Sequence, residues 1–452
     1  MPKADIDAVL RARKRVPPPG GALLEDTEKM KQKHHRMLCA FCALVILVST
    51  VFPTAAFAEQ PVDAAAAEQT LTRADAAEMQ QADAAVTALT ESEQYQEMDT
   101  DARKDAALAQ LDTLAAKGLV EKDSIYTDEE NGMVSFRYPC GVLGGILLTE
   151  PEDETLDEEN AETETASNAL SLRLPPDLGA EMQKSRAALL RRTENQAVEK
   201  FGTAVIYYAF DNTINSSRFP YYSYMQGFWS ALGLETKINI HVTVADLKKM
   251  GNYNVSVLSA HGSYYTYSYG KFLKRTRTEP IMLLTEESTF GKDLRYGFDL
   301  LAHRVIKVNG MYCVTSDFFR NAYKGGKLSN TIVYSETCEF LGVDGSEDNA
   351  MADALLSGGA QAVIGYVNNV YTVYSRSMLW DTINHLIMGQ NVGQALEHAK
   401  ATYGEDDLIW YHAQGGRRPH AAASYAVLYG NSQAALHVPE SNRSMFSADL
   451  AA

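Results

Sequence analysis

The sequence contains few cysteines, and those it has do not form a disulfide framework. Of the five, Cys39 and Cys42 lie in an N-terminal apolar segment, which leaves Cys140, Cys313 and Cys338 for the remainder of the chain. Three thiols cannot all pair with one another, so at least one is unpaired or is bonded to another molecule. This excludes a disulfide-stapled fold and leaves two explanations for the odd thiol, a reactive cysteine or a buried inert one.

Motifs of several enzyme classes are absent as well. Apart from His261, the histidines that follow the apolar segment show neither His-x-x-x-His nor His-Glu-x-x-His spacing, which argues against a zinc hydrolase. A Gly-x-Ser-x-Gly turn and a glycine-rich phosphate loop are also missing, which argues against a serine esterase and a nucleotide-binding enzyme. We therefore expect no metal site.

Long hydrophobic runs are lacking too. Residues 31–36 are basic and histidine-containing, and the apolar run 37–52 that follows is shorter than the roughly 20 residues that span a bilayer as a helix. Pro53 and the small-x-small site at residues 56–58 come next, so we interpret residues 1–58 as a signal segment that is cleaved after Ala58. Translation from Met30 and an uncleaved anchor with a cytoplasmic tail remain open alternatives.

Basic residues are fewer than acidic ones in the chain that follows the signal segment. The formal net charge is −17, and removal of residues 1–58, with nine basic and five acidic residues, lowers it to −21. Such a surface repels phosphate backbones, so we expect no nucleic-acid partner. We expect a secreted or cell-envelope protein that meets the membrane only through its signal segment and acts on a protein or peptide; nothing indicates its oligomeric state.

Composition divides the chain after the signal segment. We expect an N-terminal module of helices and extended segments over 59–149, an acidic linker over 150–175, a catalytic domain over 176–438 and a tail over 439–452. The linker prediction rests on residues 150–167, where like charges are dense and large apolar side chains are nearly absent, so that burial cannot offset the entropy of ordering.

The catalytic domain has the pattern of an α/β fold. Short apolar segments alternate with helical ones, as in a mostly parallel sheet covered by helices. The expected strands are 203–209, 255–259, 331–335, 362–366 and 425–429. The expected helices are 222–232, 245–250, 317–323, 351–356, 375–388 and 392–403, the last with Asn391 as its N-cap.

Two of these strands lead into residues that could perform nucleophilic catalysis. The strand 255–259 is followed by His261 and Gly262, and the strand 331–335 is followed by Glu336 and Cys338. In open parallel sheets reacting groups lie beyond the carboxyl ends of the strands. Imidazole can hold the proton of a thiol while the thiolate attacks a carbonyl carbon. The N–H groups of Gly262 and Cys338 can then stabilise the oxyanion.

A strand followed by His-Gly, with a later strand followed by Glu-x-Cys, resembles the caspase-like (clan CD) cysteine peptidases, the group of clostripain, gingipain and legumain. Residues 354–366 (ALLSGGAQAVIGY), 389–399 (GQNVGQALEHA) and 427–431 (VLYGN) resemble later elements of that family. The resemblance covers about residues 200–438 and implies an αβα sandwich with a mostly parallel sheet, a His261-Cys338 dyad, no cofactor and cleavage of peptide bonds. Phe340 departs from it, because legumain-like members have a small residue there.

The resemblance also bears on specificity. In related peptidases the acid two residues before the cysteine lines the pocket for the residue that precedes the cleaved bond, so Glu336 would favour arginine or lysine. Its alternative role is to hold a loop through backbone N–H groups. We place Asn368 and Asn369, just after the strand 362–366, on another wall of that pocket.

Two segments between His261 and Cys338 carry further expectations. The tyrosine-rich stretch 263–269 lines a substrate cleft or forms a partly buried loop. The basic stretch 271–277 is expected to be an exposed loop, either solvated and intact or cut by the enzyme itself after Arg275 or Arg277.

The sequence thus predicts an exported cysteine endopeptidase. A non-catalytic caspase-like module that binds a partner or scaffolds an envelope assembly explains the same fold. A transpeptidase with the same acyl-enzyme intermediate explains the same residues.

Overall fold

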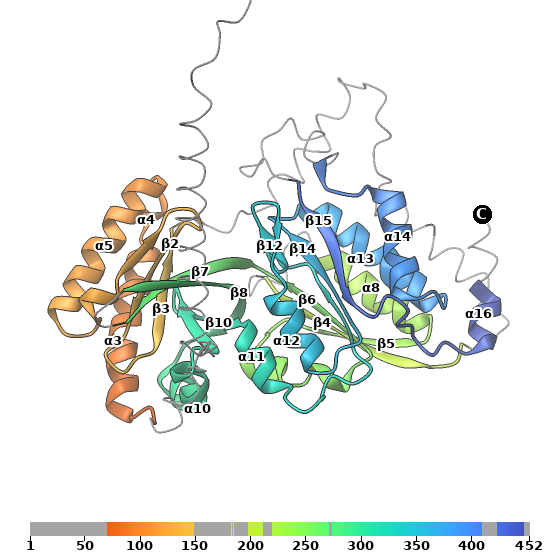
Figure 1. Ribbon diagram of the computed structural model, residues 1–452, viewed down its shortest axis with the longest axis horizontal. Coiled ribbons are helices and arrows are strands. Elements are labelled where there is room, and N and C mark those ends of the chain that lie inside the picture. Colours follow the sequence, from red (N-terminus) through yellow and green to blue (C-terminus); the bar gives the residue numbers. More distant parts are fainter. Residues whose placement is uncertain are drawn as a thin grey trace, which may run out of the picture. The chain divides into compact units, whose positions relative to one another are not determined.

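A six-stranded, mostly parallel sheet is formed by strands from the part of the chain expected to be catalytic (Figure 1). The computed structural model describes residues 70–148, 182, 184, 198–210, 219–270, 274–408 and 423–446, all within the unit Ala65–Ala452. The strand order is β15-β14-β11-β6-β4-β5, and only β15 runs antiparallel to its neighbour. The strands are β4 Gly202–Ala209, β5 Leu234–Asn239, β6 Val255–Ala260, β11 Ile332–Ser335, β14 Ala362–Val367 and β15 Tyr425–Gly430.

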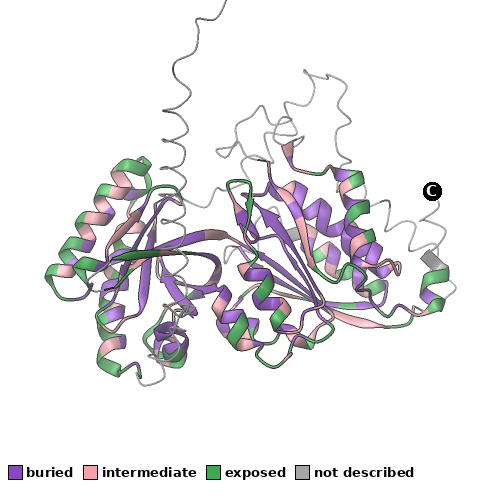
Figure 2. Cartoon of the chain, viewed as in Figure 1, coloured by how far each residue is buried: buried purple, intermediate pink, exposed green. Residues whose placement is uncertain are grey.

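Helices cover both faces of this sheet. Successive residues of a strand point to opposite sides, and here both sides carry apolar side chains that pack against helices. Val205 and Tyr207 of β4 belong to the apolar core that includes side chains of α9, α11 and α12, whereas Ile206 and Tyr208 belong to the core with α8, α13 and α14. Figure 2 shows the resulting buried strands. The helices are α8 Phe219–Ala231, α9 Val244–Leu247, α11 Ser316–Ala322, α12 Ala350–Ser357, α13 Thr372–Ile387 and α14 Val392–Tyr403.

The mixed α/β architecture expected from the sequence is confirmed. All five expected strands lie in this sheet, and each expected helix has a counterpart within a few residues. Asn391 caps α14 by accepting a hydrogen bond from the Gln394 N–H, as expected. The strand β5 was not expected, because its alternating Leu-Glu-Thr-Lys pattern at the sheet edge is less apolar than that of its neighbours.

A second sheet joins the N-terminal residues to the middle of the chain. Its order is β1-β2-β3-β9-β10-β8-β7, with the β3–β9 pair parallel and the other pairs antiparallel. The strands are β1 Tyr126–Asp128, β2 Met133–Arg137, β3 Leu143–Leu147, β7 Gly262–Tyr269, β8 Arg275–Glu287, β9 Val305–Val308 and β10 Met311–Thr315. Residues 70–148 therefore complete a sheet whose other strands are inserted between His261 and Cys338.

Shorter elements complete these two parts. The N-terminal helices expected before residue 117 are present, and the residues expected as a C-terminal tail begin with a helix whose Asn442 accepts a hydrogen bond from Glu199 N–H. The remaining elements are α3 Arg73–Thr90, α4 Glu93–Gln96, α5 Thr100–Ala116, η1 Lys122–Ser124, η2 Met250–Asn252, α10 Phe290–Leu301, β12 Gly342–Val343, β13 Ser346–Glu347 and α16 Glu440–Phe446.

A buried cluster of charges connects α3, α10 and β9. The Lys307 Nζ atom lies 2.5 Å from an Asp83 carboxylate oxygen and 2.9 Å from one of Asp293. Tyr138 and Tyr312 donate hydrogen bonds to Asp83 and Asp293, respectively. Lys307 is 2% exposed, so its charge is compensated entirely within the protein. This cluster holds the N-terminal helix α3 against the inserted segment.

Two expectations about loops are corrected. The tyrosine-rich stretch 263–269 is the strand β7, in which Tyr265 and Tyr267 are buried. Arg275 and Arg277 lie in β8 and pair with Tyr269 and Tyr267 of β7, so their backbone is not an exposed loop. Alternating Tyr, Thr and Ser suits a pleated, half-buried surface, which explains why these segments form strands.

Other expectations concern residues outside those described. The signal segment 1–58 with its cleavage site, the linker 150–175 and residues 271–273 of the basic stretch belong to this group. Among the described residues, no helix is long and apolar enough to cross a membrane.

Candidate functional site

The carboxyl ends of three neighbouring parallel strands meet at one edge of the six-stranded sheet. Ala209 of β4 pairs with Ala260 of β6, and Ser335 of β11 pairs with Leu258 of β6. His261 follows β6 directly, while Cys338 lies three residues beyond β11. Every residue of β6 and β11 is buried, which fixes the register of both strands and hence where the two segments emerge.

Gly262 brings the histidine segment into contact with the cysteine segment. A Cβ atom built on Gly262 would lie 2.1 Å from the carbonyl oxygen of Cys338 and 2.5 Å from Cγ2 of Thr337. Only a glycine permits this approach of the two backbones. The absence of a side chain at position 262 therefore determines how closely the His261 and Cys338 segments pack.

The register of β7 orients the Gly262 N–H. The Leu283 N–H donates to the His261 carbonyl at 2.9 Å, and Gly262 is opposite Met282. In an antiparallel ladder this pattern makes Gly262 and Met282 a non-hydrogen-bonded pair, so the Gly262 N–H points away from β8. That direction is compatible with the expected oxyanion role.

The turn that contains Cys338 is held by backbone hydrogen bonds to the neighbouring strand end. The Glu339 N–H donates to the Asn368 carbonyl at 3.0 Å, and the Leu341 N–H donates to Tyr366 at 2.9 Å. Glu339 has a φ of 54°, an uncommon conformation for a residue other than glycine. Cys338 is half-buried, and its Sγ atom lies 3.9 Å from the Val370 carbonyl oxygen.

Phe340, where the sequence departs from the legumain-like pattern, packs against a glycine of β14. A Cβ atom on Gly365 would lie 2.9 Å from the Phe340 ring, and Phe340 is 1% exposed. The missing side chain at Gly365 thus provides the space that the larger residue needs after Cys338-Glu339.

His261 is half-buried beside a residue from a third strand end. The Phe210 ring, just after β4, meets the His261 imidazole edge to face with the ring centroids 4.9 Å apart. An aromatic edge in this position restricts the orientations of the imidazole.

The two other described cysteines lie in different environments. None of Cys140, Cys313 and Cys338 is in a disulfide. Burial raises the pKa of the Cys140 thiol and of the Cys313 thiol, and Cys313 lies in β10 with no exposed surface. A raised pKa lowers the thiolate population at neutral pH, so neither is well suited to act as a nucleophile.

Glu336 extends into the protein rather than to the surface. Its carboxylate accepts hydrogen bonds from Tyr222 at 2.9 Å and Ser375 at 3.3 Å, and it is 3% exposed. Burial raises the pKa of Glu336 to about 7, against the opposing effects of these hydrogen bonds and of the Arg376 charge. Tyr222 comes from α8, and Ser375 and Arg376 come from α13. Glu336 thus connects the cysteine segment to two helices.

The two asparagines differ in exposure. Asn368 is 4% exposed; its side chain accepts a hydrogen bond from the Gly345 N–H and donates one to the Ala423 carbonyl. It therefore fixes the shape of the loops beside Cys338. Asn369 is half-buried and follows it in the same segment.

Sequence reasoning missed Phe210, Tyr222, Ser375 and Arg376 near these residues. Arg376 was the most visible signal, because a charged residue interrupts the otherwise largely uncharged first turns of α13. It is 1% exposed, and its guanidinium carbon lies 4.5 Å from the centroid of the Tyr221 ring. The positive charge of a buried arginine requires a compensating negative charge. Glu336 lies near enough to interact with the Arg376 charge.

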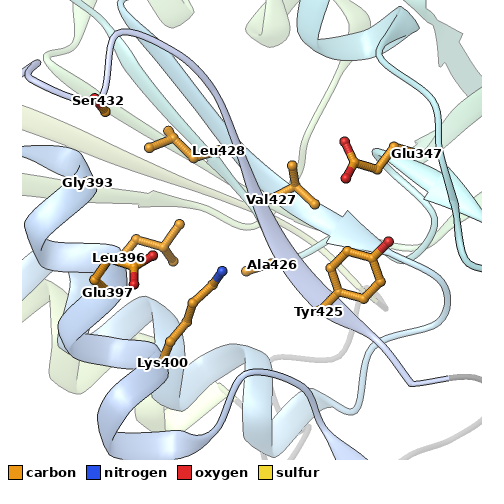
Figure 3. Close-up of a pocket in the computed structure, with 10 residues that line it drawn as sticks. All are labelled: Glu347, Gly393, Leu396, Glu397, Lys400, Tyr425, Ala426, Val427, Leu428 and Ser432. Atoms are coloured by element: carbon orange, nitrogen blue, oxygen red, sulfur yellow. The ribbon is translucent and has the colours of Figure 1, made fainter.

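A surface hollow of about 430 Å³ lies away from this region (Figure 3). It is flanked by α14, β15 and Glu347, and neither His261 nor Cys338 lines it. It therefore does not belong to the candidate site.

We predict that Gly262→Ala destabilises the fold by about 1–3 kcal/mol, because the new methyl group overlaps the Cys338 carbonyl and forces one backbone to move. Urea unfolding measures the loss. Gly291→Ala on α10 is the matched control, because a Cβ atom there meets nothing within 4 Å. Equal midpoints for the two variants would contradict the close approach.

Comparison with known proteins does not extend this description. A scan against models of protein families gives no match, and neither does a search of curated proteins.

Proposed function

We propose that the protein is a cysteine endopeptidase with a caspase-like αβα fold and a His261-Cys338 dyad. The observation that carries the proposal is the contact between Gly262 and the Cys338 peptide at the carboxyl ends of adjacent strands β6 and β11. The mostly parallel sheet with helices on both faces supports the fold assignment.

In the proposed reaction, Cys338 Sγ attacks the carbonyl carbon of the peptide bond, and the thiol proton passes to His261. The N–H groups of Gly262 and Cys338 hydrogen-bond the oxyanion that forms. When the C–N bond breaks, His261 gives its proton to the leaving amine. Water, activated by His261, then hydrolyses the acyl-enzyme and restores the thiol.

The remaining sequence expectations complete the proposal. We place the enzyme in the secreted or cell-envelope fraction, with protein or peptide substrates and no nucleic-acid partner. A binding or scaffold module would have the same fold, but it would not need a half-buried histidine and a half-buried cysteine on two segments that meet at the same sheet edge. A transpeptidase would differ in transferring the acyl group to an amine.

A peptidyl electrophile is expected to label Cys338 and no other cysteine. The reason is that burial raises the pKa of the other two described thiols, while His261 can take up the proton of Cys338. Peptide mass spectrometry of the modified mature chain identifies the labelled residue. The proposed dyad would be contradicted if Cys140 were labelled at the same rate as Cys338. It would also be contradicted if the His261→Ala variant were labelled as fast as the wild type.

Glu336→Gln is expected to weaken a preference for Arg or Lys before the cleaved bond by about tenfold or more, since it removes the carboxylate that would pair with the substrate cation. Cleavage of matched peptides ending in Arg, Lys, Asn or Asp measures the preference. Glu336 is 3% exposed and already accepts hydrogen bonds from Tyr222 and Ser375, so an unchanged preference in Glu336→Gln would leave it only the role of supporting the cysteine segment.

Glu339→Gln is the control for this measurement, because it removes an acid whose pKa burial also raises to about 7 from the same turn. A preference of the wild type for Asn or Asp, or an equal loss in both variants, would refute the specificity role of Glu336.

A further inference from the structure

The helical hairpin of α13 and α14 brings two histidines and an aspartate together. Asp381 and His385 lie four residues apart on α13 and so share a face, while His398 lies on α14. One ligand atom from each residue lies within 4.8 Å of those of the other two. No spacing pattern along the chain indicates this cluster, because its two histidines belong to different helices.

The distances within the cluster are close to those of a metal site. His398 Nδ1 lies 2.7 Å from Asp381 Oδ2, and His385 Nε2 lies 3.8 Å from Asp381 Oδ1. Ligand atoms around one tetrahedral zinc ion are about 3.3 Å apart, given zinc–ligand distances of about 2.0–2.1 Å. The separations of the three ligand atoms are thus near those that one ion requires.

The cluster has one buried wall and one open side. The side chains of His385 and Asp381 are 9% and 14% exposed, and that of His398 is 46% exposed. An ion can enter past His398, and water can complete its coordination there. The two imidazole rings are 3.7 Å apart at an angle of 33°, so they have to splay to bind one ion.

We propose that Asp381, His385 and His398 form a binding site for a divalent transition-metal ion of the zinc class. Two imidazole nitrogens with one carboxylate oxygen suit Zn²⁺ and related ions, whereas Ca²⁺ and Mg²⁺ select oxygen ligands. In this site His385 Nε2, His398 Nδ1 and one Asp381 oxygen are the ligands. The proton that joins His398 Nδ1 to Asp381 moves to Nε2 or to solvent when the ion binds.

The surroundings of His385 favour Nε2 as its ligand atom. Its Nδ1 atom is buried and makes no well-directed hydrogen bond, and neither does Oε1 of Gln390, although Gln390 is near enough to influence the pKa of His385. A small rotation of the ring would let Nδ1–H donate to Gln390, which fixes Nε2 as the ligand.

The ion would fasten α13 to α14. α13 also carries Ser375, which hydrogen-bonds Glu336, so the site stabilises a helix that supports the cysteine segment. Without an ion, the same residues form a polar contact between helices through the His398–Asp381 hydrogen bond. Metal titration distinguishes the two roles.

The test uses the tag-free mature chain with Cys338→Ala, because the thiol and imidazole of the proposed dyad would otherwise bind zinc. Calorimetric titration is expected to show one Zn²⁺ per chain, and excess Zn²⁺ is expected to raise Tm by at least about 3 °C. Co²⁺ in place of Zn²⁺ is expected to give visible absorption bands. Ca²⁺ at the same concentration is expected to leave Tm unchanged.

In the same background, His398→Ala is expected to weaken Zn²⁺ binding at least about tenfold and to abolish the Tm increase. Because His398 is exposed, this variant is expected to fold as the parent does, and Asp381→Asn provides an independent second variant. His437→Ala removes another exposed histidine and is expected to bind as the parent does. Absent Zn²⁺ binding in the parent, or equal affinity in the parent and His398→Ala, would overturn the site.

Discussion

Cys338→Ala is expected to reduce peptidase turnover by at least about a thousandfold, because it removes the proposed nucleophile, while the melting temperature stays within a few degrees. His261→Ala is expected to have nearly the same effect. The double variant is expected to be little worse than either single one, because the two residues act as a unit. Single-turnover cleavage of a fluorogenic peptide measures all three.

Cys140→Ala is the matched control, since it removes a half-buried thiol from a segment outside the proposed site. It is expected to retain turnover. Substantial activity in Cys338→Ala, with the protein free of contaminating peptidase, would show that another residue carries the reaction.

Lys307→Met is expected to lower the free energy of unfolding by about 3–5 kcal/mol, because it leaves the carboxylates of Asp83 and Asp293 buried without their cation. Urea titration followed by tryptophan fluorescence measures the change. Lys248→Met is the matched control. Its partner Asp299 is as close, at 2.7 Å, but the lysine side chain is 41% exposed, so a loss of no more than about 1 kcal/mol is expected.

A second measurement applies if Lys307→Met does not fold. Adding Asp83→Asn and Asp293→Asn removes the uncompensated charges and is expected to restore folding. Equal losses for Lys307→Met and Lys248→Met would show that the buried cluster contributes no more than a surface ion pair.

The six-stranded sheet was predictable because its central strands are short, apolar and buried on both faces. Residues of β6, β11 and β14 are buried along their whole length, so their sequences contain little except hydrophobic and small side chains. Such segments stand out from the helices between them. Their order in the sheet also places His261 and Cys338 at the same edge, as the strand-end argument expects.

The second sheet was not predictable in the same way. Its strands β7 and β8 are rich in Tyr, Thr and Arg, which also occur in loops, and no local pattern indicates their partners. The same holds for the surroundings of Glu336. Tyr222 and Ser375 reach it from helices 114 and 39 residues away in sequence, and only the packing of α8 and α13 brings them together.

The pairing of β3 with β9 has a consequence for the order of folding. Gly144 and Gly145 precede their partners Lys307 and Val308 by 163 residues. As the chain is synthesised from its N-terminus, β3 therefore has an unpaired edge until about two thirds of the protein has emerged. Pairing of such distant segments is slow, and an open strand edge invites association with other chains. The nascent protein consequently depends on rapid emergence of the inserted segment, or on a chaperone that shields β3, to avoid aggregation.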